Sequence, residues 1–262
     1  MRLRLSKHHG LGNDFLVALG GEPLEAAAAK RLCDRRRGIG ADGLIVASPP
    51  ERGGDAAMVL YNADGSRAEM SGNGIRCLAQ ALAAARGLKA GPLLIETDAG
   101  DRRVEVAPGG DPSSVEVSVD MGAPGPGPAP DRPLPSGLRS GLADLGNPHL
   151  VVLVDDPAAV ALAERGAALE SHFRRGVNVE FIAPAPGRSD TLDLRVWERG
   201  VGATEACGTG ACAAAHLAHG WGLVGPEVLV RMPGGEARVV LGRTITLVGP
   251  AVHIADIEVE LV

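Results

Sequence analysis

The sequence has few aromatic residues and few cysteines, and both shortages limit what the protein can be. Aromatic side chains make up 2% of its 262 residues, so a core has to be built from Val, Leu, Ile and Ala. The four cysteines (Cys33, Cys77, Cys207 and Cys212) lack paired C-x-x-C spacing. Neither a zinc or other metal site nor a disulfide framework is therefore indicated.

Long apolar runs and basic blocks are also missing. No run is long enough to span a bilayer, and residues 1–10 carry charge without the apolar segment of a signal peptide. The formal net charge is −6, and no block of basic residues suggests nucleic acid. We therefore expect a cytoplasmic protein with neither a nucleic-acid nor a membrane partner. The length suits one large or two medium domains.

Residues 197–215, W-E-R-G-V-G-A-T-E-A-C-G-T-G-A-C-A-A-A, form the most informative stretch of the chain. The small apolar run after Cys207 predicts a buried helix that starts at or just after this residue. A thiol there lies beside unpaired backbone N–H groups and the positive end of the helix dipole, surroundings that lower a cysteine's pKa. Flanking glycines would let an anionic small molecule reach the backbone amides. On this stretch alone, a tightly packed helix start with a buried cysteine remains the alternative.

The same pattern occurs twice in the chain. Residues 71–74, S-G-N-G, match residues 207–210, C-G-T-G, at an offset of 136 residues (207 − 71). Three further pairs follow in the same order at nearly this offset: Leu60–Asn62 with Val196–Glu198, Gly12–Val17 with Gly146–Val151, and Arg37–Gly40 with Arg175–Asn178. We interpret the chain as two halves of one ancestral unit, each with a hydroxyl or a thiol at a helix N-terminus. A site between the halves would place these two groups on opposite sides of one ligand.

The remaining pattern predicts an α+β fold of two pseudo-symmetric domains, each a mostly antiparallel sheet around a central apolar helix. Further helices are expected over Pro23–Cys33 and Pro157–Ser171. The first domain is predicted at 1–122, with the C-terminal strand 251–262 as a candidate to complete it. The Pro- and Gly-rich residues 123–137 are predicted to be a connector, and 138–262 the second domain.

Together the motifs resemble the diaminopimelate epimerase family over nearly the whole chain, in order and at the family's spacing. The residues that carry the resemblance are Lys7–Phe15, Gly38–Gly43, Asn62–Ser66, Gly72–Cys77, Gly146–His149, Asn178–Val179, Glu198–Gly200 and Ala206–Gly210. The resemblance implies an epimerase that works without a cofactor, pyridoxal phosphate included. The partner would be a small-molecule amino-acid substrate, since the family interconverts LL- and meso-diaminopimelate in lysine and cell-wall biosynthesis. It also implies a homodimer and a site in the cleft between two domains.

Inverting a stereocentre by proton transfer needs a base on one face of the α-carbon and an acid on the other. By position, the resemblance makes Cys207 one acid/base, with Ser71 at the position of the other. Two helix N-termini converging on the α-carboxylate would stabilise the carbanion as fixed dipoles. The resemblance assigns the remaining residues as follows: Gly72, Asn73, Gly208 and Thr209 line the reacting centre; Asn13, Asn62, Asn147, Asn178, Glu198 and Arg199 hold the rest of the substrate; His149 and Glu198 tune the pKa values of the acid/base pair.

Ser71 departs from the family, which has its second catalytic thiol at this position. A hydroxyl is a far weaker acid than a thiol and needs an adjacent base to react. Three explanations stay open: an engineered Cys→Ser change; a native serine, with a slow relay or another reaction such as an amino-acid racemase or proline-derivative dehydratase of the same fold; or a catalytically silent amino-acid-binding protein. Ala203, where the family commonly has Glu, is a second and milder departure.

Overall fold

The computed structural model describes residues 2–20 and 24–260, and the chain divides into two compact units. Unit 1 comprises Met1–Asp120 and Val248–Val262, and unit 2 comprises Met121–Leu247. The last strand of the chain pairs with the first and therefore belongs to unit 1. The predicted connector belongs to unit 2, since the Met121 N–H donates to the Ile245 carbonyl and Gly125 bridges to Asp144.

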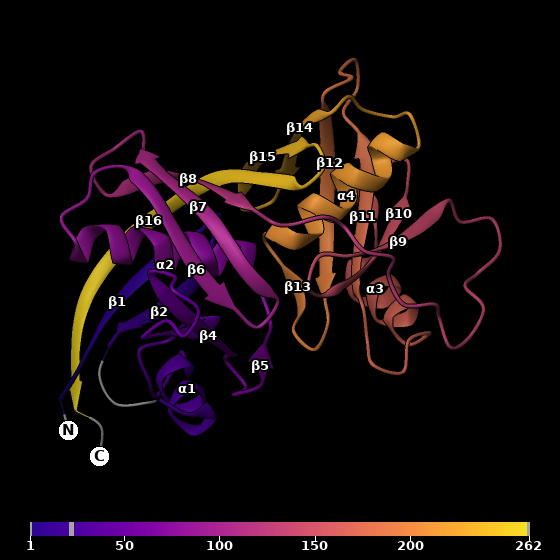
Figure 1. The fold of residues 1–262 in the computed structure, drawn as a ribbon. Helices are drawn as coiled ribbons and strands as arrows, with labels where there is room; N and C mark the ends of the chain where they lie inside the picture. The colour runs from indigo at the N-terminus through magenta and orange to yellow at the C-terminus, as the bar shows by residue number, and fades with distance from the viewer. Residues whose placement is uncertain (1, 21–23, 261–262) are drawn as a thin grey trace. The chain divides into compact units, whose positions relative to one another are not determined.

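Unit 1 is a ring of hydrogen-bonded strands around one helix (Figure 1). Its strands are β1 (Arg2–Gly10), β2 (Asn13–Leu19), β3 (Gly43–Ser48), β4 (Ala56–Asn62), β5 (Arg67–Ala68), β6 (Gly91–Thr97), β7 (Gly100–Pro108), β8 (Ser114–Asp120) and the part of β16 (Ile245–Glu260) from Val248. The order around the ring is β1-β2-β3-β4-β6-β7-β8-β16, and β16 pairs back with β1 from Arg2↔Glu260 to His9↔Val252.

Helix α2 (Gly72–Ala85) fills this ring and is buried from Gly72 to Ala83. It contacts strands on several sides, among them β1, β2, β7 and β8. Helix α1 (Ala26–Cys33) packs instead against β3 and β4 in a separate cluster with Leu16, Leu32 and Leu44. The helix predicted over Pro23–Cys33 is thus present from Ala26, and its predicted start at Pro23 lies outside the described residues.

Unit 2 has the same kind of architecture. Its strands are β9 (Ser140–Asp144), β10 (Pro148–Leu153), β11 (Asn178–Pro184), β12 (Thr191–Glu198), β13 (Gly202–Thr204), β14 (Glu227–Met232) and β15 (Gly235–Leu241), and its helices are η1 (Pro157–Ala159), α3 (Leu162–Glu170) and α4 (Gly208–Gly220). The single helix predicted over 157–171 is split because Val160 adopts an extended backbone. Helix α4 packs against β9, β10, β11, β12, β14 and β15 and is almost wholly buried up to Ala215.

The two units repeat one pairing scheme. Strands β2 and β3 are parallel, β3 and β4 antiparallel, and β4 pairs with β5 before α2 begins. Strands β10, β11, β12 and β13 pair in the same senses before α4 begins. Helix α1 joins β2 to β3, and α3 lies between β10 and β11. The predicted α+β fold of two pseudo-symmetric halves is confirmed.

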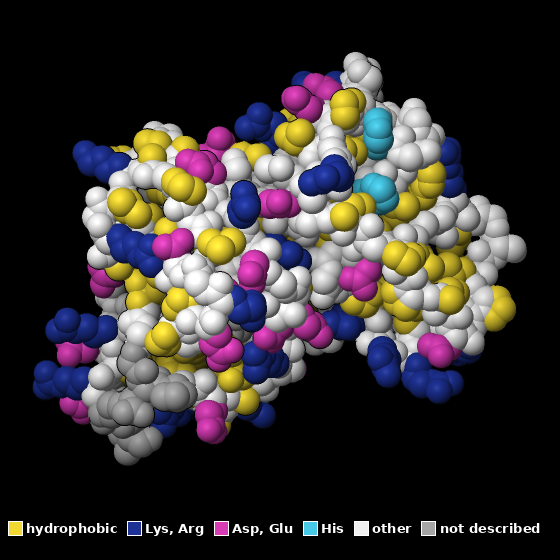
Figure 2. Space-filling view, viewed as in Figure 1, with side chains coloured by type: hydrophobic (Ala, Val, Ile, Leu, Met, Phe, Trp, Pro, Cys, Tyr) yellow, Lys and Arg dark blue, Asp and Glu magenta, His cyan; other side chains and the backbone are white. Residues whose placement is uncertain are grey.

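Charges of both signs lie interspersed on the face of the molecule shown in Figure 2, and apolar side chains are scattered between them. Within residues 2–20 and 24–260, no helix is both long and apolar enough to cross a membrane.

Candidate active site in two half-sites

The two central helices begin in the same way. Ser71 caps α2 with φ −141° and ψ 121°, and its Oγ accepts from the Gly74 N–H at 3.0 Å. Cys207 caps α4 with φ −130° and ψ 115°, and its Sγ accepts from the Gly210 N–H at 3.4 Å. The structure therefore places the hydroxyl and the thiol at equivalent positions, each at the positive end of a buried helix.

The third residue of each helix is a glycine, and the space beside it is filled. A Cβ on Gly210 would lie 2.6 Å from Oε1 of Glu180, and a Cβ on Gly74 would lie 3.2 Å from the Cβ of Ser71. Gly72 and Gly208 are the first residues of the two helices and are buried. The missing side chain at Gly210 thus lets the Glu180 carboxylate approach the helix tip closely.

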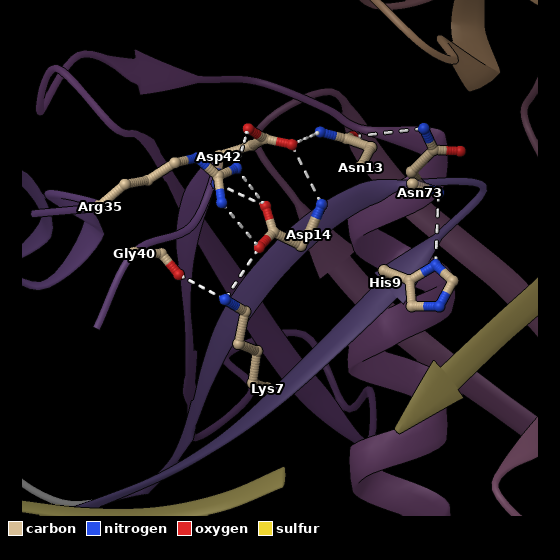
Figure 3. Close-up of polar contacts among 9 residues, drawn as sticks. Lys7, His9, Asn13, Asp14, Arg35, Gly40, Asp42 and Asn73 are labelled. Atoms are coloured by element: carbon tan, nitrogen blue, oxygen red, sulfur yellow. Dashed lines mark hydrogen bonds and ion pairs between the residues drawn. The ribbon is translucent and has the colours of Figure 1, made fainter. Parts of the chain in front are cut away.

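In unit 1, two asparagine side chains connect the helix tip to the turn before β3 (Figure 3). Asn73 is 1% exposed, and its Nδ2 donates to Oδ1 of Asn13 at 3.2 Å. Asn13 in turn donates from Nδ2 to Oδ2 of Asp42 at 2.8 Å. These two predicted substrate-binding residues therefore lie together, and Asp42 fixes one of them.

Asp42 belongs to an ion-pair cluster at the edge of this half-site. Arg35 binds both Asp42 and Asp14, and the Lys7 ammonium lies 3.0 Å from Asp14 and donates to the Gly40 carbonyl (Figure 3). Burial raises the pKa of the Asp14 carboxyl, but hydrogen bonds from Arg35 and Lys7 outweigh it and hold that pKa below its usual range. The cluster keeps the turn that carries Asn13 in place.

Arg76 fixes the helix tip from behind. Its guanidinium is 0% exposed and donates to the Gly72 carbonyl, to Oδ1 of Asn73 and to the Pro250 carbonyl of β16. Asn62, also a predicted binding residue, donates to the Ser66 hydroxyl within its own turn.

In unit 2, a continuous chain of contacts leads from the thiol to a buried carboxylate. Sγ of Cys207 lies 3.4 Å from Oγ1 of Thr209, which lies 3.2 Å from Nδ2 of Asn147. Oδ1 of Asn147 lies 3.0 Å from Nε2 of His149, and Nδ1 of His149 lies 2.6 Å from Oε1 of Glu180. His149 and Glu180 have side chains that are 0% exposed. Four of the predicted site residues thus form one network with Glu180, which the sequence analysis did not include.

The other predicted residues of unit 2 lie at the end of β12 and beside it. Oδ1 of Asn178 accepts from the backbone N–H of Arg199, and its Nδ2 donates to the Pro148 carbonyl. Glu198 accepts a hydrogen bond from the Thr204 hydroxyl. Asn178 therefore positions the backbone at Arg199.

The protonation of Cys207 differs from the expectation drawn from its place at a helix N-terminus. Burial, followed by the negative charges of Glu198 and Glu180, raises the pKa of the Cys207 thiol well above its usual value. The hydrogen bonds from Thr209 and Gly210 act in the opposite direction but do not outweigh these effects. The predicted lowering is wrong for this structure, because desolvation and two carboxylates dominate over the helix dipole.

Arg76, Asp42 and Glu180 shape the half-sites, yet sequence reasoning assigned them no role. Arg76 is the one charged residue in the buried helix α2, and Glu180 is the one charged residue in β11. A lone charge in a buried element signals an internal partner, because an unpaired buried charge is costly. That signal could have singled out Arg76 and Glu180 as structural groups, without naming their partners.

Comparison with known proteins gives a family match over most of the chain. The family model described as diaminopimelate epimerase matches residues 5–125 and 141–253. A diaminopimelate epimerase from Synechococcus elongatus is 39% identical over 100% of this chain and 99% of its own length. Another, from Desulforudis audaxviator, is 43% identical over 89% of each chain.

A crystal structure of a hydroxyproline epimerase from Agrobacterium vitis has a similar fold. Its TM-score is 0.74 at 21% identity, covering 98% of this chain and 92% of that one. At this identity the likeness supports the fold alone.

Proposed function

The chain belongs to the diaminopimelate epimerase family and is an isomerase, and we propose that it interconverts LL- and meso-diaminopimelate by two-base proton transfer. In this proposal Cys207 serves one face of the α-carbon and Ser71 the other. The observation that carries it is the matched pair of helix caps, in which Oγ of Ser71 and Sγ of Cys207 make the same contact to the third residue of their helices.

The polar surroundings of the caps suit a developing carbanion. Removal of an α-proton places negative charge next to the substrate carboxylate, and fixed N–H donors stabilise such charge without reorganising. Gly72, Asn73, Gly208 and Thr209 would line the carboxylate and amino end of the reacting centre, where backbone N–H groups would donate to the α-carboxylate. His149 and Glu198 would tune the acid/base pair.

The asparagines and Arg199 would hold the rest of the substrate. Asn13, Asn62, Asn147 and Asn178 offer amide donors and acceptors for an ammonium and a carboxylate. A planar guanidinium can bind the distal carboxylate through two parallel hydrogen bonds, which is the role we assign to Arg199. Glu198 would bind the substrate's ammonium group.

The proposed reaction needs no pyridoxal phosphate. Such a cofactor is held by a lysine, and the chain has three: Lys7, Lys30 and Lys89. Lys7 is bound to Asp14 and the Gly40 carbonyl, while Lys30 and Lys89 are exposed. We further propose that the enzyme acts in the cytoplasm, as a homodimer, in lysine and cell-wall biosynthesis.

Proton exchange tests the proposal directly. LL- and meso-diaminopimelate are incubated separately with the enzyme in D2O, and NMR and chiral analysis follow the α-proton and the configuration. Exchange accompanied by inversion from either isomer is the expected result. Binding without any exchange would contradict the proposal and favour an amino-acid-binding protein.

A one-base enzyme of the same fold is the second candidate, and the hydroxyl of Ser71 is the observation that favours it. Ser71 caps α2 through Oγ and offers a weak acid where the family has a thiol. Such an enzyme would exchange the α-proton, or eliminate a leaving group, without inverting the centre. Exchange with retained configuration in the same D2O experiment would identify it.

A further inference from the structure

The two units treat their asparagine side chains differently. In unit 1 the orientations of the Asn73 and Asn13 side-chain amides are fixed, because Arg76 can only donate and the Asp42 carboxylate accepts. Oδ1 of Asn73 must therefore accept, and its Nδ2 donates to Asn13, whose own Nδ2 donates to Asp42 (Figure 3). The direction of this chain of hydrogen bonds is fixed at both ends.

In unit 2 the direction is free to reverse. Asn147 lies between Nε2 of His149 and Oγ1 of Thr209, and an imidazole nitrogen and a hydroxyl can each donate or accept. Thr209 in turn meets Sγ of Cys207, where either atom could be the donor. Either orientation of the Asn147 amide therefore satisfies the whole chain of contacts.

Each orientation belongs to one pair of protonation states. With His149 as imidazolium, Nε2 donates to Oδ1 of Asn147, the amide nitrogen donates to Thr209, and the Thr209 hydroxyl donates to a thiolate. With His149 neutral, Nε2 accepts from the amide, Oδ1 accepts from Thr209, and the thiol of Cys207 donates to Thr209. Both states hold the same number of protons, because the proton lost by Sγ is gained by Nε2.

A thiolate beside a neutral His149 is the disfavoured combination. The Thr209 hydroxyl then donates to the sulfur, and the amide oxygen of Asn147 must face either a lone pair of Thr209 or one of Nε2. A buried acceptor without a donor is costly. The network thus links the ionisation of Cys207 to the charge on His149.

We propose that Glu180 is a positioning residue which, through His149 and the reversible amide of Asn147, makes the thiolate of Cys207 available in a buried site. Glu180 accepts from Nδ1 of His149, and its second oxygen has no hydrogen-bond partner among the described residues. A buried carboxylate is stabilised by a paired positive charge, so Glu180 favours the imidazolium. The groups that act on Cys207 are the carboxylates of Glu180 on β11 and Glu198 on β12, and His149 on β10 reaches it through the network.

The proposal fixes the sign of a measurable effect. Acting only through space, the negative charge of Glu180 disfavours a thiolate, so Glu180→Gln would speed alkylation of Cys207. Acting through the network, Glu180 supports the thiolate, so the same variant should slow alkylation. We expect iodoacetamide to react about tenfold or more slowly in Glu180→Gln, the equivalent of one lost charge-assisted hydrogen bond. Peptide mass mapping distinguishes the alkylation of Cys207 from that of the three other cysteines.

Thr209→Val supplies the matched control. It removes the hydroxyl that joins Asn147 to Cys207 and nearly preserves the volume. In this background only the through-space effect remains, so adding Glu180→Gln should speed alkylation. Alkylation that is unchanged or faster on Glu180→Gln in the wild-type background would overturn the proposal.

A second measurement covers the case in which Glu180→Gln does not fold. Long-range 1H–15N NMR reads the protonation of His149, and the assigned signal is followed with and without Cys207→Ser. We expect Cys207→Ser to lower the imidazolium fraction in the wild-type background and to leave it unchanged in Thr209→Val. An equal change in both backgrounds would mean coupling through space and would overturn the proposal.

The inference rests on the proposed catalytic role of Cys207, but neither readout uses substrate. Failure of the D2O experiment would leave the predicted alkylation and NMR results standing. Alkylation and NMR results that contradict the network would leave the expected deuterium exchange at the α-carbon unaffected.

Discussion

A single sulfur-for-oxygen difference separates the two helix caps, and it falls on the atoms that would carry protons. Oγ of Ser71 and Sγ of Cys207 occupy equivalent positions, yet a thiol reaches its anion many orders of magnitude more readily than an aliphatic hydroxyl. The difference therefore bears on the chemistry of the cap far more than on its structure.

Ser71→Cys should raise the rate of epimerisation by about 10²- to 10⁴-fold, the usual contribution of a well-placed acid/base group. In the proposed two-base reaction, the change restores a competent proton carrier on the second face of the α-carbon. Steady-state conversion of LL- to meso-diaminopimelate measures the effect.

Ser71→Ala is the control for this prediction, since it removes the cap at a cost of about 1 kcal/mol and supplies no proton carrier. No gain with Ser71→Cys, in a protein as stable as the wild type, would show that the half-site in unit 1 no longer supports inversion.

Within α4, the contact between Gly210 and Glu180 links the helix tip to the sheet beneath it. Gly210→Ala would place a Cβ 2.6 Å from Oε1 of Glu180, and the carboxylate is held by His149 and cannot move freely. We expect a loss of about 1–3 kcal/mol in the free energy of unfolding, typical of an overpacked core, together with reduced activity. Urea denaturation measures the first and epimerisation the second.

Gly220→Ala is the matched control at the other end of the same helix. A Cβ there meets no atom within 4 Å, so the change should be neutral or stabilise by up to about 1 kcal/mol. Equal effects at Gly210 and Gly220 would show that the close approach to Glu180 does not constrain the helix tip.

Helix starts could be predicted from the sequence because their signals are local. Ser71 and Cys207 each precede a glycine and a small apolar run, and the structure begins α2 and α4 directly after them. The repeat was visible for the same reason, since equivalent caps recur at one offset. The split of the helix predicted over 157–171 could not be foreseen from its Ala- and Leu-rich composition.

The partners of the site residues could not be predicted, because they come from separate elements. Arg76 reaches Pro250, which lies 174 residues further along the chain, and Glu180 meets His149 only because β10 and β11 pair in parallel register. The same limit explains the error on Cys207. The local sequence predicts a lowered pKa for a thiol at a helix N-terminus. In the structure, burial and two carboxylates from β11 and β12 raise the pKa of Cys207.

Strands β1 and β16 pair in the ring of unit 1, and His8 on β1 lies opposite His253 on β16. His8 is 1% exposed and forms hydrogen bonds with Gln80 of α2 and with Ser6. The centroid of its ring lies 5.1 Å from that of the His253 ring on β16. Burial, together with His253, lowers the pKa of His8 to about 4, against opposing effects of Gln80 and Asp256. His8 is therefore neutral in the folded protein near pH 7.

Acid should weaken the protein through this histidine. Because the folded-state pKa of about 4 lies below the unfolded value of 6.5, the unfolded chain binds more protons between these pH values, and stability falls as the pH falls. The loss attributable to His8 between pH 7 and pH 5 is about 2 kcal/mol. Urea unfolding of the wild type and of His8→Gln across this range measures it. We expect the advantage of the wild type over the variant to shrink by that amount on acidification, and a constant difference would mean that His8 titrates alike in the folded and unfolded chain.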